Sequence, residues 1–331
     1  MLKSGNWLLN KYSVSQQILH QVALSSNFLK ELYFDLEKSL FLNKTSEIND
    51  NYVFIAGMAR SGTTIVLNAI YKSNEFASFT YQEMPFVLAP NLWSSINKGG
   101  IAIEKKERAH GDGIKIDTNS PEAFEEVFWK TFDSNDSDTY DDFKHLIKLL
   151  CLKHGKTRYL SKNNQNIKRI DKILEYHPHS KVIIPFRDPI QHAFSLLSQH
   201  KRFNLLQKEN PFARRYMSWI GHSEFGMDYE PTFKDETIYN NHEDLNHWLE
   251  QWRLCYKSLQ QYKNNSNVRF NCYESLCGNP KEWKSLLDFI GLESVDDFDF
   301  NESKKQISVC YDKDLYGQCK RLYKSLLKQT S

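Results

Sequence analysis

Two short apolar runs, each followed by a helical pattern, organise the hydrophobic positions of this chain. Residues 52–56 and 182–186 are apolar and rich in strand-forming side chains, which predicts two buried strands. The first run leads into residues 63–70, whose apolar side chains suit a buried helix. The second leads into residues 190–197, where apolar side chains recur at i, i+3, i+4 and i+7. Strands that alternate with helices predict a three-layer α/β fold, in which helices cover both faces of a mainly parallel sheet.

Other patterns predict the remaining elements. They indicate helices over residues 14–41, 143–151, 245–259, 280–290 and 318–327, and strands over residues 76–83 and 268–272. Residues 120–124 have the pattern of a helix N-terminus, and residues 133–142 that of an acidic surface loop. Pro185 cannot donate a ladder N–H, so we expect the strand that contains it to be distorted near its end.

A glycine loop joins the first predicted strand to its helix. The spacing Gly57-x-x-x-x-Gly62-Thr63-Thr64 is that of a nucleotide-triphosphate loop, except that Thr63 stands where the phosphate-binding lysine belongs. The glycines let the backbone approach a ligand, and the loop amides with the helix N-terminus offer N–H donors to an anion. A cation at Arg60 in place of the lysine favours a smaller phosphate group than the β- and γ-phosphates of ATP. The same spacing also occurs in loops that bind nothing, so other residues must decide.

The second predicted strand is followed by a candidate site for another phosphate. Arg187-Asp188-Pro189 forms its exit, and Pro189 suits the first turn of the following helix. Arg187 and Ser195 would then converge on a second phosphate. Taken singly, Arg187 fits a salt bridge and Ser195 a solvated helix position equally well. Their combination with the glycine loop favours the phosphate interpretation.

Four segments together resemble a known family. GMARSGTT and FRDPIQHAFSLL look like the 5′-phosphosulfate loop and the 3′-phosphate motif of sulfotransferases that use 3′-phosphoadenosine 5′-phosphosulfate (PAPS). YLSKNNQN, followed by IKRIDKILEYHPHSKV, is similar to the strand, lysine and helix that precede the family's 3′-phosphate strand. YESL, followed by NPKEWKSLLDFIGL, resembles its late strand and helix. The branch of the family that these segments resemble includes tyrosylprotein and many bacterial carbohydrate sulfotransferases. The segments span residues 52–292 and follow one another in the same order as in the family.

The resemblance implies a fold like that of nucleotide kinases and P-loop NTPases, and in-line transfer of a sulfuryl group from PAPS to a hydroxyl without a metal. Arg60 and Lys162 would stabilise the charge that develops on the departing 5′-phosphate. Glu83 would accept the proton of the hydroxyl. The residues implied in donor binding are Ala59, Arg60, Ser61, Gly62, Thr63, Thr64, Arg187, Ser195 and Tyr273. The glycine-rich basic late loop of the cytosolic sulfotransferases is absent, so the resemblance names no residues that close over the nucleotide.

The resemblance also suggests a domain organisation and an acceptor. We expect residues 1–50 to form an N-terminal helical extension and residues 51–331 the sulfotransferase domain. Residues 203–242 show no lasting period and mix aromatic with charged side chains. This composition suits an acceptor-binding or lid insertion, because aromatic rings stack on sugars, although an irregular packing segment has it too. The aromatic segment and the bacterial carbohydrate relatives favour a saccharide acceptor over a peptide.

Composition and charge fit an enzyme with a small-molecule donor. The 331 residues are 40% hydrophobic and 14% aromatic, which is enough for one large domain or two small ones. The net charge is +2, from 43 Lys and Arg residues against 41 Asp and Glu residues. This overall charge does not indicate binding to nucleic acid or to an acidic membrane. The six cysteines include no C-x-x-C pair, which favours reduced thiols. Without a signal-peptide pattern or a spanning segment, the expectation is a cytoplasmic protein, and a homo-oligomer is compatible with it.

Two other functions fit parts of the sequence. A P-loop phosphotransferase or ATPase would use Asp188 as a magnesium ligand, but the missing loop lysine argues against it. A non-catalytic binding protein would keep only the nucleotide fold, which the two phosphate motifs together with Lys162 argue against. If Glu83 is not the base, His110 and Asp112 are the next candidates. One histidine and one aspartate are too few ligands to argue for zinc.

Overall fold

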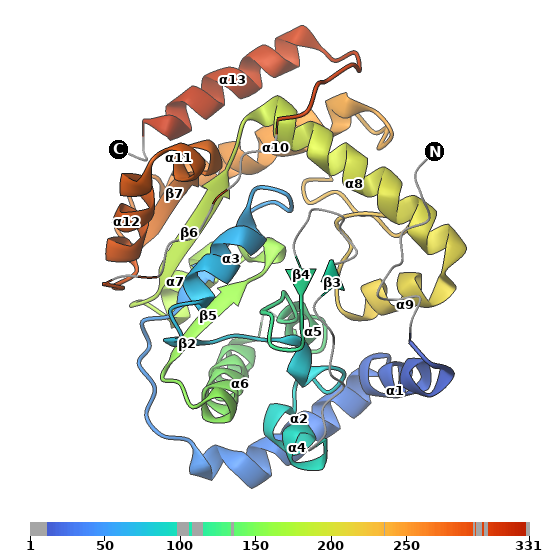
Figure 1. Ribbon diagram of the computed structural model, residues 1–331, viewed down its shortest axis with the longest axis vertical. Coiled ribbons are helices and arrows are strands. Elements are labelled where there is room, and N and C mark those ends of the chain that lie inside the picture. Colours follow the sequence, from blue (N-terminus) through green and yellow to red (C-terminus); the bar gives the residue numbers. More distant parts are fainter. Residues whose placement is uncertain are drawn as a thin grey trace. The chain divides into compact units, whose positions relative to one another are not determined.

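The computed structural model describes residues 12–97, 106–107, 115–133, 136–234, 236–293, 295, 300 and 304–328. The chain divides into two compact units, each assembled from segments that are distant in the sequence (Figure 1). Unit one comprises Met1–Asn49, Glu75–Tyr159 and Leu205–Ser223, and unit two comprises Asp50–Asn74, Leu160–Asn204 and Glu224–Ser331. The glycine loop and the predicted 3′-phosphate residues therefore belong to unit two, whereas Glu83 belongs to unit one. The predicted extension, residues 1–50, and the predicted insertion, residues 203–242, stay predictions.

The central sheet has five strands in the order β2-β5-β1-β6-β7. The strands are β1 (Val53–Ile55), β2 (Phe76–Ala77), β5 (Arg158–Lys162), β6 (Lys181–Phe186) and β7 (Val268–Cys272). All four pairings between neighbours are parallel. Strand β5 begins in unit one, where it pairs with β2, and continues in unit two, where it pairs with β1. The predicted α/β class with a parallel sheet is confirmed.

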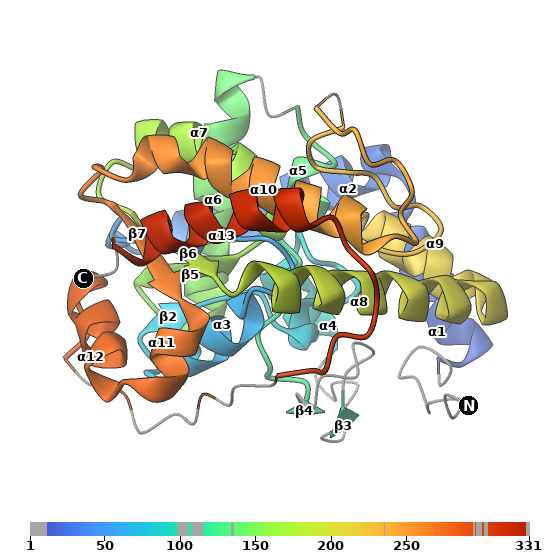
Figure 2. The same ribbon diagram turned by 90° about the horizontal axis from the view of Figure 1, so that it is seen from above.

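In unit two, the sheet lies between helices. Strand β1 is fully buried at all of its three residues, as expected of a strand covered on both faces. Helix α3 (Thr63–Tyr71) lies on one side of the strands, and α7 (Ile170–Tyr176) and α10 (Leu245–Leu259) lie on the other (Figure 2). Within its described residues, this unit also contains the α-helices α11 (Tyr273–Gly278), α12 (Pro280–Phe289) and α13 (Lys313–Leu327), and α8 (Pro189–Glu209) begins in it.

Unit one packs helices around aromatic side chains. Phe34, Phe128 and Phe143 are fully buried at its centre, and Phe128 lies between the other two with ring centroids 6.0 and 5.3 Å away. Its α-helices are α1 (Val14–Leu24), α2 (Asn27–Phe41), α4 (Pro90–Ile96), α5 (Glu126–Trp129), α6 (Ser137–His154) and α9 (Pro211–Trp219), with a two-stranded hairpin of β3 (Lys106–Glu107) and β4 (Lys115–Ile116). None of the helices in the described ranges is long and apolar enough to cross a membrane.

Capping residues divide two segments differently from the prediction. The helix expected over residues 14–41 is two helices, because the Ser26 side chain accepts the N–H of Leu29 and starts α2 anew. The strand expected over residues 76–83 stops after Ala77. Thr80 and Glu83 then form a capping box that begins a short 3₁₀ helix over Tyr81–Glu83.

Other boundaries also depart from the pattern. Residues 133–142 are not all loop, because Asp136 caps α6 and the helix begins at Ser137. Residues 120–124 do not begin a helix, since Pro121 bridges to Thr80 and the helix starts at Glu126. Residues 203–242 contain the end of α8 and all of α9, so part of this segment is regular. Pro185 lies one residue before the end of β6, where it pairs with Asn271 of β7, and the expected distortion of this end stays a prediction.

Candidate functional site

The loop between β1 and α3 has the conformation that the glycine pattern predicts. Gly62 has a φ of 99° and stands at the N-cap position of α3. Its left-handed backbone is open to glycine and strained for other residues. At Gly57, a Cβ atom would lie 3.1 Å from Ser61 Oγ and 3.2 Å from Pro185 Cδ. The loop therefore requires glycine at position 62, and a side chain at position 57 would need its neighbours to shift by a few tenths of an ångström.

The hydroxyl residues of the loop are buried. Ser61 is fully buried and its Oγ donates to the carbonyl of Met58 over 2.8 Å, which closes the turn. Thr63 and Thr64 form the start of α3, where N–H groups have no acceptor within the helix. Such a terminus carries partial positive charge. The arrangement favours an anion in front of α3.

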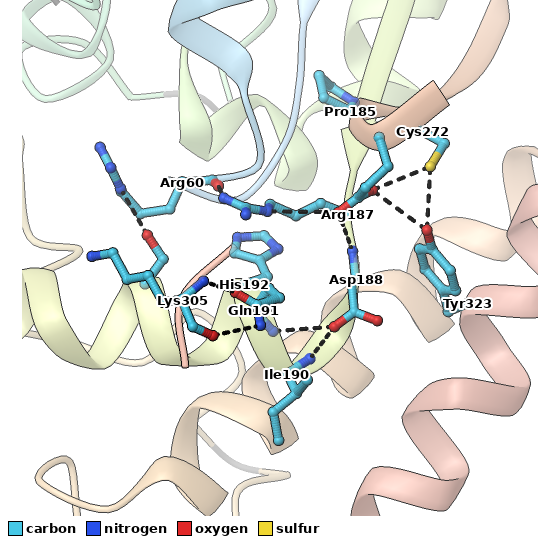
Figure 3. Close-up of polar contacts among 12 residues, drawn as sticks. Arg60, Pro185, Arg187, Asp188, Ile190, Gln191, His192, Cys272, Lys305 and Tyr323 are labelled. Carbon is cyan, nitrogen blue, oxygen red and sulfur yellow. Dashed lines mark hydrogen bonds and ion pairs between the residues drawn. The ribbon is translucent and has the colours of Figure 1, made fainter. Parts of the chain in front are cut away.

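The loop is held by residues of the chain that follows β6 (Figure 3). Arg60 Nε donates to Ser195 Oγ over 3.2 Å, and Arg187 Nη1 donates to the carbonyl of Arg60 over 3.4 Å. His192 Nε2 lies 2.8 Å from the carbonyl of Ala59. The structure thus brings together the two groups of residues that the sequence assigns to separate phosphates, the loop on one side and Arg187 with Ser195 on the other.

Asp188 has structural partners. Its Oδ1 accepts the N–H groups of Ile190 and Gln191, both over 3.2 Å, and so caps the start of α8. Its Oδ2 lies 2.9 Å from the Nζ atom of Lys320. These three donors give the Asp188 carboxylate a structural role. The rival phosphotransferase interpretation would instead make it a magnesium ligand.

Tyr273 lies against the loop. It is the first residue of α11, and its ring packs on Gly62 so closely that a Cβ there would lie 2.5 Å from Tyr273 Cδ2. The guanidinium of Arg187 is 5.7 Å from the ring centroid. The next residue, Glu274, accepts the N–H of Asp188 over 2.9 Å and lies 3.9 Å from Arg187 Nε. The first residues of α11, directly after β7, therefore support both the loop and the exit of β6.

Lys162 is the last residue of β5 and is buried to more than nine-tenths. Its register partner is Ile55, the last residue of β1. Because the strands are parallel, both strands end at the same edge of the sheet, from which the glycine loop departs. This edge is where open α/β sheets bind their ligands.

Glu83 is a buried, ion-paired carboxylate of unit one. It is fully buried, and its Oε1 lies 3.2 Å from both Lys153 Nζ and His154 Nε2. Its Oε2 accepts the N–H of Thr80 over 2.6 Å and the hydroxyl of Thr80 over 2.9 Å. Burial alone would raise the pKa of Glu83, but the hydrogen bond and charge of His154, with the charge of Lys153, lower it below the ordinary value. The side chain is therefore ionised at neutral pH.

Two of the sequence candidates are not placed. His110 and Asp112 lie outside the described residues. Among the residues that are described, no group of three or more His, Cys, Asp or Glu side chains is arranged to hold a metal ion.

Comparison with known proteins decides the family. A family model described as the sulfotransferase family matches residues 52–297, which is most of the chain and includes the loop, Lys162, Arg187 and Tyr273. This chain belongs to the sulfotransferase family. The resemblance inferred from the motifs is confirmed, and the protein is a sulfotransferase enzyme. Members of the family use PAPS as the sulfuryl donor.

Several solved sulfotransferase structures resemble the chain, and the first described here shares its fold. A sulfotransferase from Mycobacterium tuberculosis matches with a TM-score of 0.53 at 10% identity, over 86% of this chain and 79% of that one. One from Mycobacterium avium has a TM-score of 0.48 at 13% identity, over 96% and 79%. One from Alicyclobacillus acidocaldarius has a TM-score of 0.39 at 16% identity, over 84% and 93%. No curated protein sequence matches the chain.

The motifs missed two residues that support the site of this sulfotransferase. His192 touches the loop directly, and its spacing from Ser195, i to i+3, could have placed both on one face of the helix. Glu274 supports Arg187 and Asp188, but nothing in its local sequence distinguishes it from a surface carboxylate.

Proposed function

We propose that this sulfotransferase transfers the sulfuryl group of PAPS to a hydroxyl of a saccharide. The observation that carries the donor part is the convergence of loop and helix α8, with Arg60 Nε 3.2 Å from Ser195 Oγ and Arg187 on the Arg60 carbonyl. A donor with phosphates at the 5′ and 3′ positions of one ribose needs two anion sites at a fixed separation. The glycine loop and the start of α8 supply two such sites from adjacent strands.

Each predicted residue has a role in this proposal. Residues 59–64 would hold the 5′-phosphosulfate through backbone N–H groups and the terminus of α3. Arg187 and Ser195 would hold the 3′-phosphate, and Tyr273 would contact the nucleotide beside Gly62. Arg60 and Lys162 would stabilise the charge on the departing phosphate, where burial strengthens electrostatic attraction.

The donor supplies an activated sulfuryl group. One sulfur–oxygen bond to the 5′-phosphate breaks, and one forms to the acceptor oxygen. Glu83 would take the hydroxyl proton on an ionised carboxylate, a state that its partners Lys153 and His154 favour. The products are a sulfate ester and 3′-phosphoadenosine 5′-phosphate (PAP).

A small cavity of unit two, with a volume of about 30 Å³, lies beside the donor loop. Met58 and Ala59 of the loop form part of its wall, together with the aromatic side chains of Tyr229 and Trp248. Glu224, which accepts the amide N–H of Asn164 over 2.9 Å, also lines it. Aromatic faces pack on the C–H groups of sugars, and carboxylate and amide groups bind their hydroxyls. The cavity itself holds only a water-sized group, so its support for the saccharide assignment is the set of aromatic and polar side chains beside the donor loop.

The acceptor class can be tested by product analysis. The enzyme would be incubated with PAPS and separate panels of oligosaccharides, tyrosine-containing peptides and simple phenols, and sulfated products identified by mass spectrometry. We expect sulfation in the oligosaccharide panel. Products confined to peptides or phenols would retain the transferase activity and overturn the saccharide assignment.

A further inference from the structure

One buried histidine contacts the phosphate loop from the adjacent helix. His192 lies in the second turn of α8 and is fully buried. Its Nε2 is 2.8 Å from the carbonyl oxygen of Ala59, 133 positions earlier in the chain. The contact links α8 to the residue that precedes Arg60.

The chemistry of this contact determines which nitrogen of the His192 ring carries the proton. Burial lowers the pKa of His192 to about 3, and the charges of Arg187 and Arg60 also lower it, so the ring is neutral at pH 7. A neutral imidazole has one N–H, and a carbonyl oxygen can only accept, so the proton is on Nε2. Nδ1 has no hydrogen-bond partner in the part of the chain that the structure describes. The single donor of this buried ring is thus directed at the backbone of the loop.

The contact determines which way a peptide group faces. In a trans peptide, C=O and N–H point in opposite directions, so a carbonyl of Ala59 directed at His192 turns the N–H of Arg60 away from α8. The carbonyl of Arg60 is held in the same manner by Arg187. Arg60 has a φ of 69°, a left-handed conformation that is costly for a residue with a Cβ. Contacts on both sides of this residue maintain its conformation.

We infer that His192 is a positioning residue, which holds the carbonyl of Ala59 so that loop N–H groups face the 5′-phosphosulfate of the donor. This inference rests on the proposed function of the loop. Helix α8 and the residues just before it would then have two roles. Arg187 and Ser195 bind the 3′-phosphate, and His192 acts on the 5′ end indirectly, through the backbone of the loop.

The test compares two nucleotides that differ only in the group at the loop. Calorimetry would give dissociation constants for PAP and for adenosine 3′-monophosphate, which lacks the 5′-phosphate. In His192→Ala, we expect the dissociation constant of PAP to rise about tenfold, which corresponds to the net contribution of one hydrogen bond. The dissociation constant of the 3′-monophosphate should change less than about twofold. His192→Gln should recover most of the PAP affinity, because its amide N–H can reach the same carbonyl.

A second buried histidine of unit two provides the matched control. His177 is also buried, and its ring stacks on that of Phe54, with the centroids 6.1 Å apart. His177→Ala should lower the melting temperature while leaving the affinity ratio of the two nucleotides unchanged.

Three outcomes would each contradict a different part of this inference or of the proposed function. Equal weakening of both nucleotides by His192→Ala would mean general damage and overturn the inference. A His192→Gln variant as weak as the alanine variant would exclude the donated hydrogen bond. A wild-type enzyme that binds PAP no tighter than the 3′-monophosphate would instead contradict the phosphate role of the loop, and with it the proposed function.

Discussion

At the scale of single residues, Arg187 links the two proposed phosphate sites. It contacts the carbonyl of Arg60 and lies near Glu274, so its guanidinium is oriented before a ligand arrives. If it binds the 3′-phosphate through charge-assisted hydrogen bonds, Arg187→Ala should weaken PAP binding by about 2–5 kcal/mol. Titration calorimetry measures this directly.

Arg269 is a close match for the control. Its ion pair with Glu282 also measures 3.9 Å, and its side chain is 16% exposed against 13% for Arg187. Arg269→Ala should leave the PAP affinity unchanged. Equal losses in the two variants, or unchanged affinity in Arg187→Ala, would remove Arg187 from the donor site.

Glu83 can be both a proton acceptor and a structural ion pair, and the two roles have separate readouts. Glu83→Gln removes the basic oxygen, so turnover should fall by roughly 10²–10⁴-fold while PAP affinity is retained. Turnover is measured at saturating donor and acceptor, with the acceptor identified in the oligosaccharide panel. Turnover within about threefold of wild type would show that the base lies elsewhere.

A buried carboxylate of the same unit controls for loss of stability. Glu37 is fully buried and accepts the N–H groups of Asn91 and Leu92 at the start of α4, over 2.9 and 2.8 Å. Glu37→Gln should lower the free energy of unfolding while turnover per folded molecule stays near wild type. A matching fall in turnover would indicate that damage to unit one, rather than proton transfer, explains the Glu83 result.

The ion pairs of Glu83 also predict a pH dependence of stability. Its pKa in the folded state is lower than the ordinary value of 4.5, so folding stabilises the ionised form. This stabilisation is complete above about pH 4.5 and is lost as the pH falls through the folded pKa. Denaturant unfolding from pH 7 to pH 3 should show wild type and Glu83→Gln converging in stability below that pH. A constant difference across the range would contradict the ionised pair.

At the scale of elements, the packing of α11 on the loop makes Gly62 critical. Alanine there would be strained at a φ of 99° and would place Cβ 2.5 Å from the Tyr273 ring. Gly62→Ala should destabilise the protein by more than the roughly 1–3 kcal/mol expected for backbone strain alone, and should weaken PAP binding. Differential scanning calorimetry and titration give the two quantities.

Gly155 isolates the backbone contribution. It has a φ of 61°, and nothing lies within 4 Å of where its Cβ would be. Gly155→Ala should therefore show strain without a clash and leave PAP binding unchanged. If the two alanine variants lose equal stability, the contact between Gly62 and Tyr273 does not constrain the loop.

Elements defined by local chemistry could be predicted from the sequence, and those defined by tertiary contacts could not. The strand at 268–272 has the predicted bounds, because a polar turn over residues 263–267 precedes it and helix α11 begins directly after it. Strand β2 stops at Ala77, and the short helix after it begins with a Thr80-x-x-Glu83 capping box, a local signal that the apolar pattern alone does not reveal. The same holds for the site: the loop follows from glycine spacing, whereas the buried pairing of Glu83 with Lys153 and His154 joins residues 70 or more positions apart.

At the scale of the whole molecule, the account depends on one ligand property. Family membership makes the protein a sulfotransferase, and the convergence of the loop with Arg187 and Ser195 supports a donor with phosphates at both the 5′ and 3′ positions. ATPases and phosphotransferases recognise a chain of phosphates with magnesium instead. Nucleotide selectivity without metal therefore separates the two mechanisms.

The most direct test is a thermal-shift comparison of PAP, AMP and ATP at equal concentration in the presence of EDTA. A ligand that binds only the folded protein stabilises it by about 2.7 kcal/mol at a hundred times its dissociation constant. PAP should raise the melting temperature by several degrees, AMP and ATP should raise it much less, and added magnesium should not alter the order. Equal shifts from PAP and AMP, or an ATP shift that exceeds that of PAP when magnesium is present, would contradict the proposed donor.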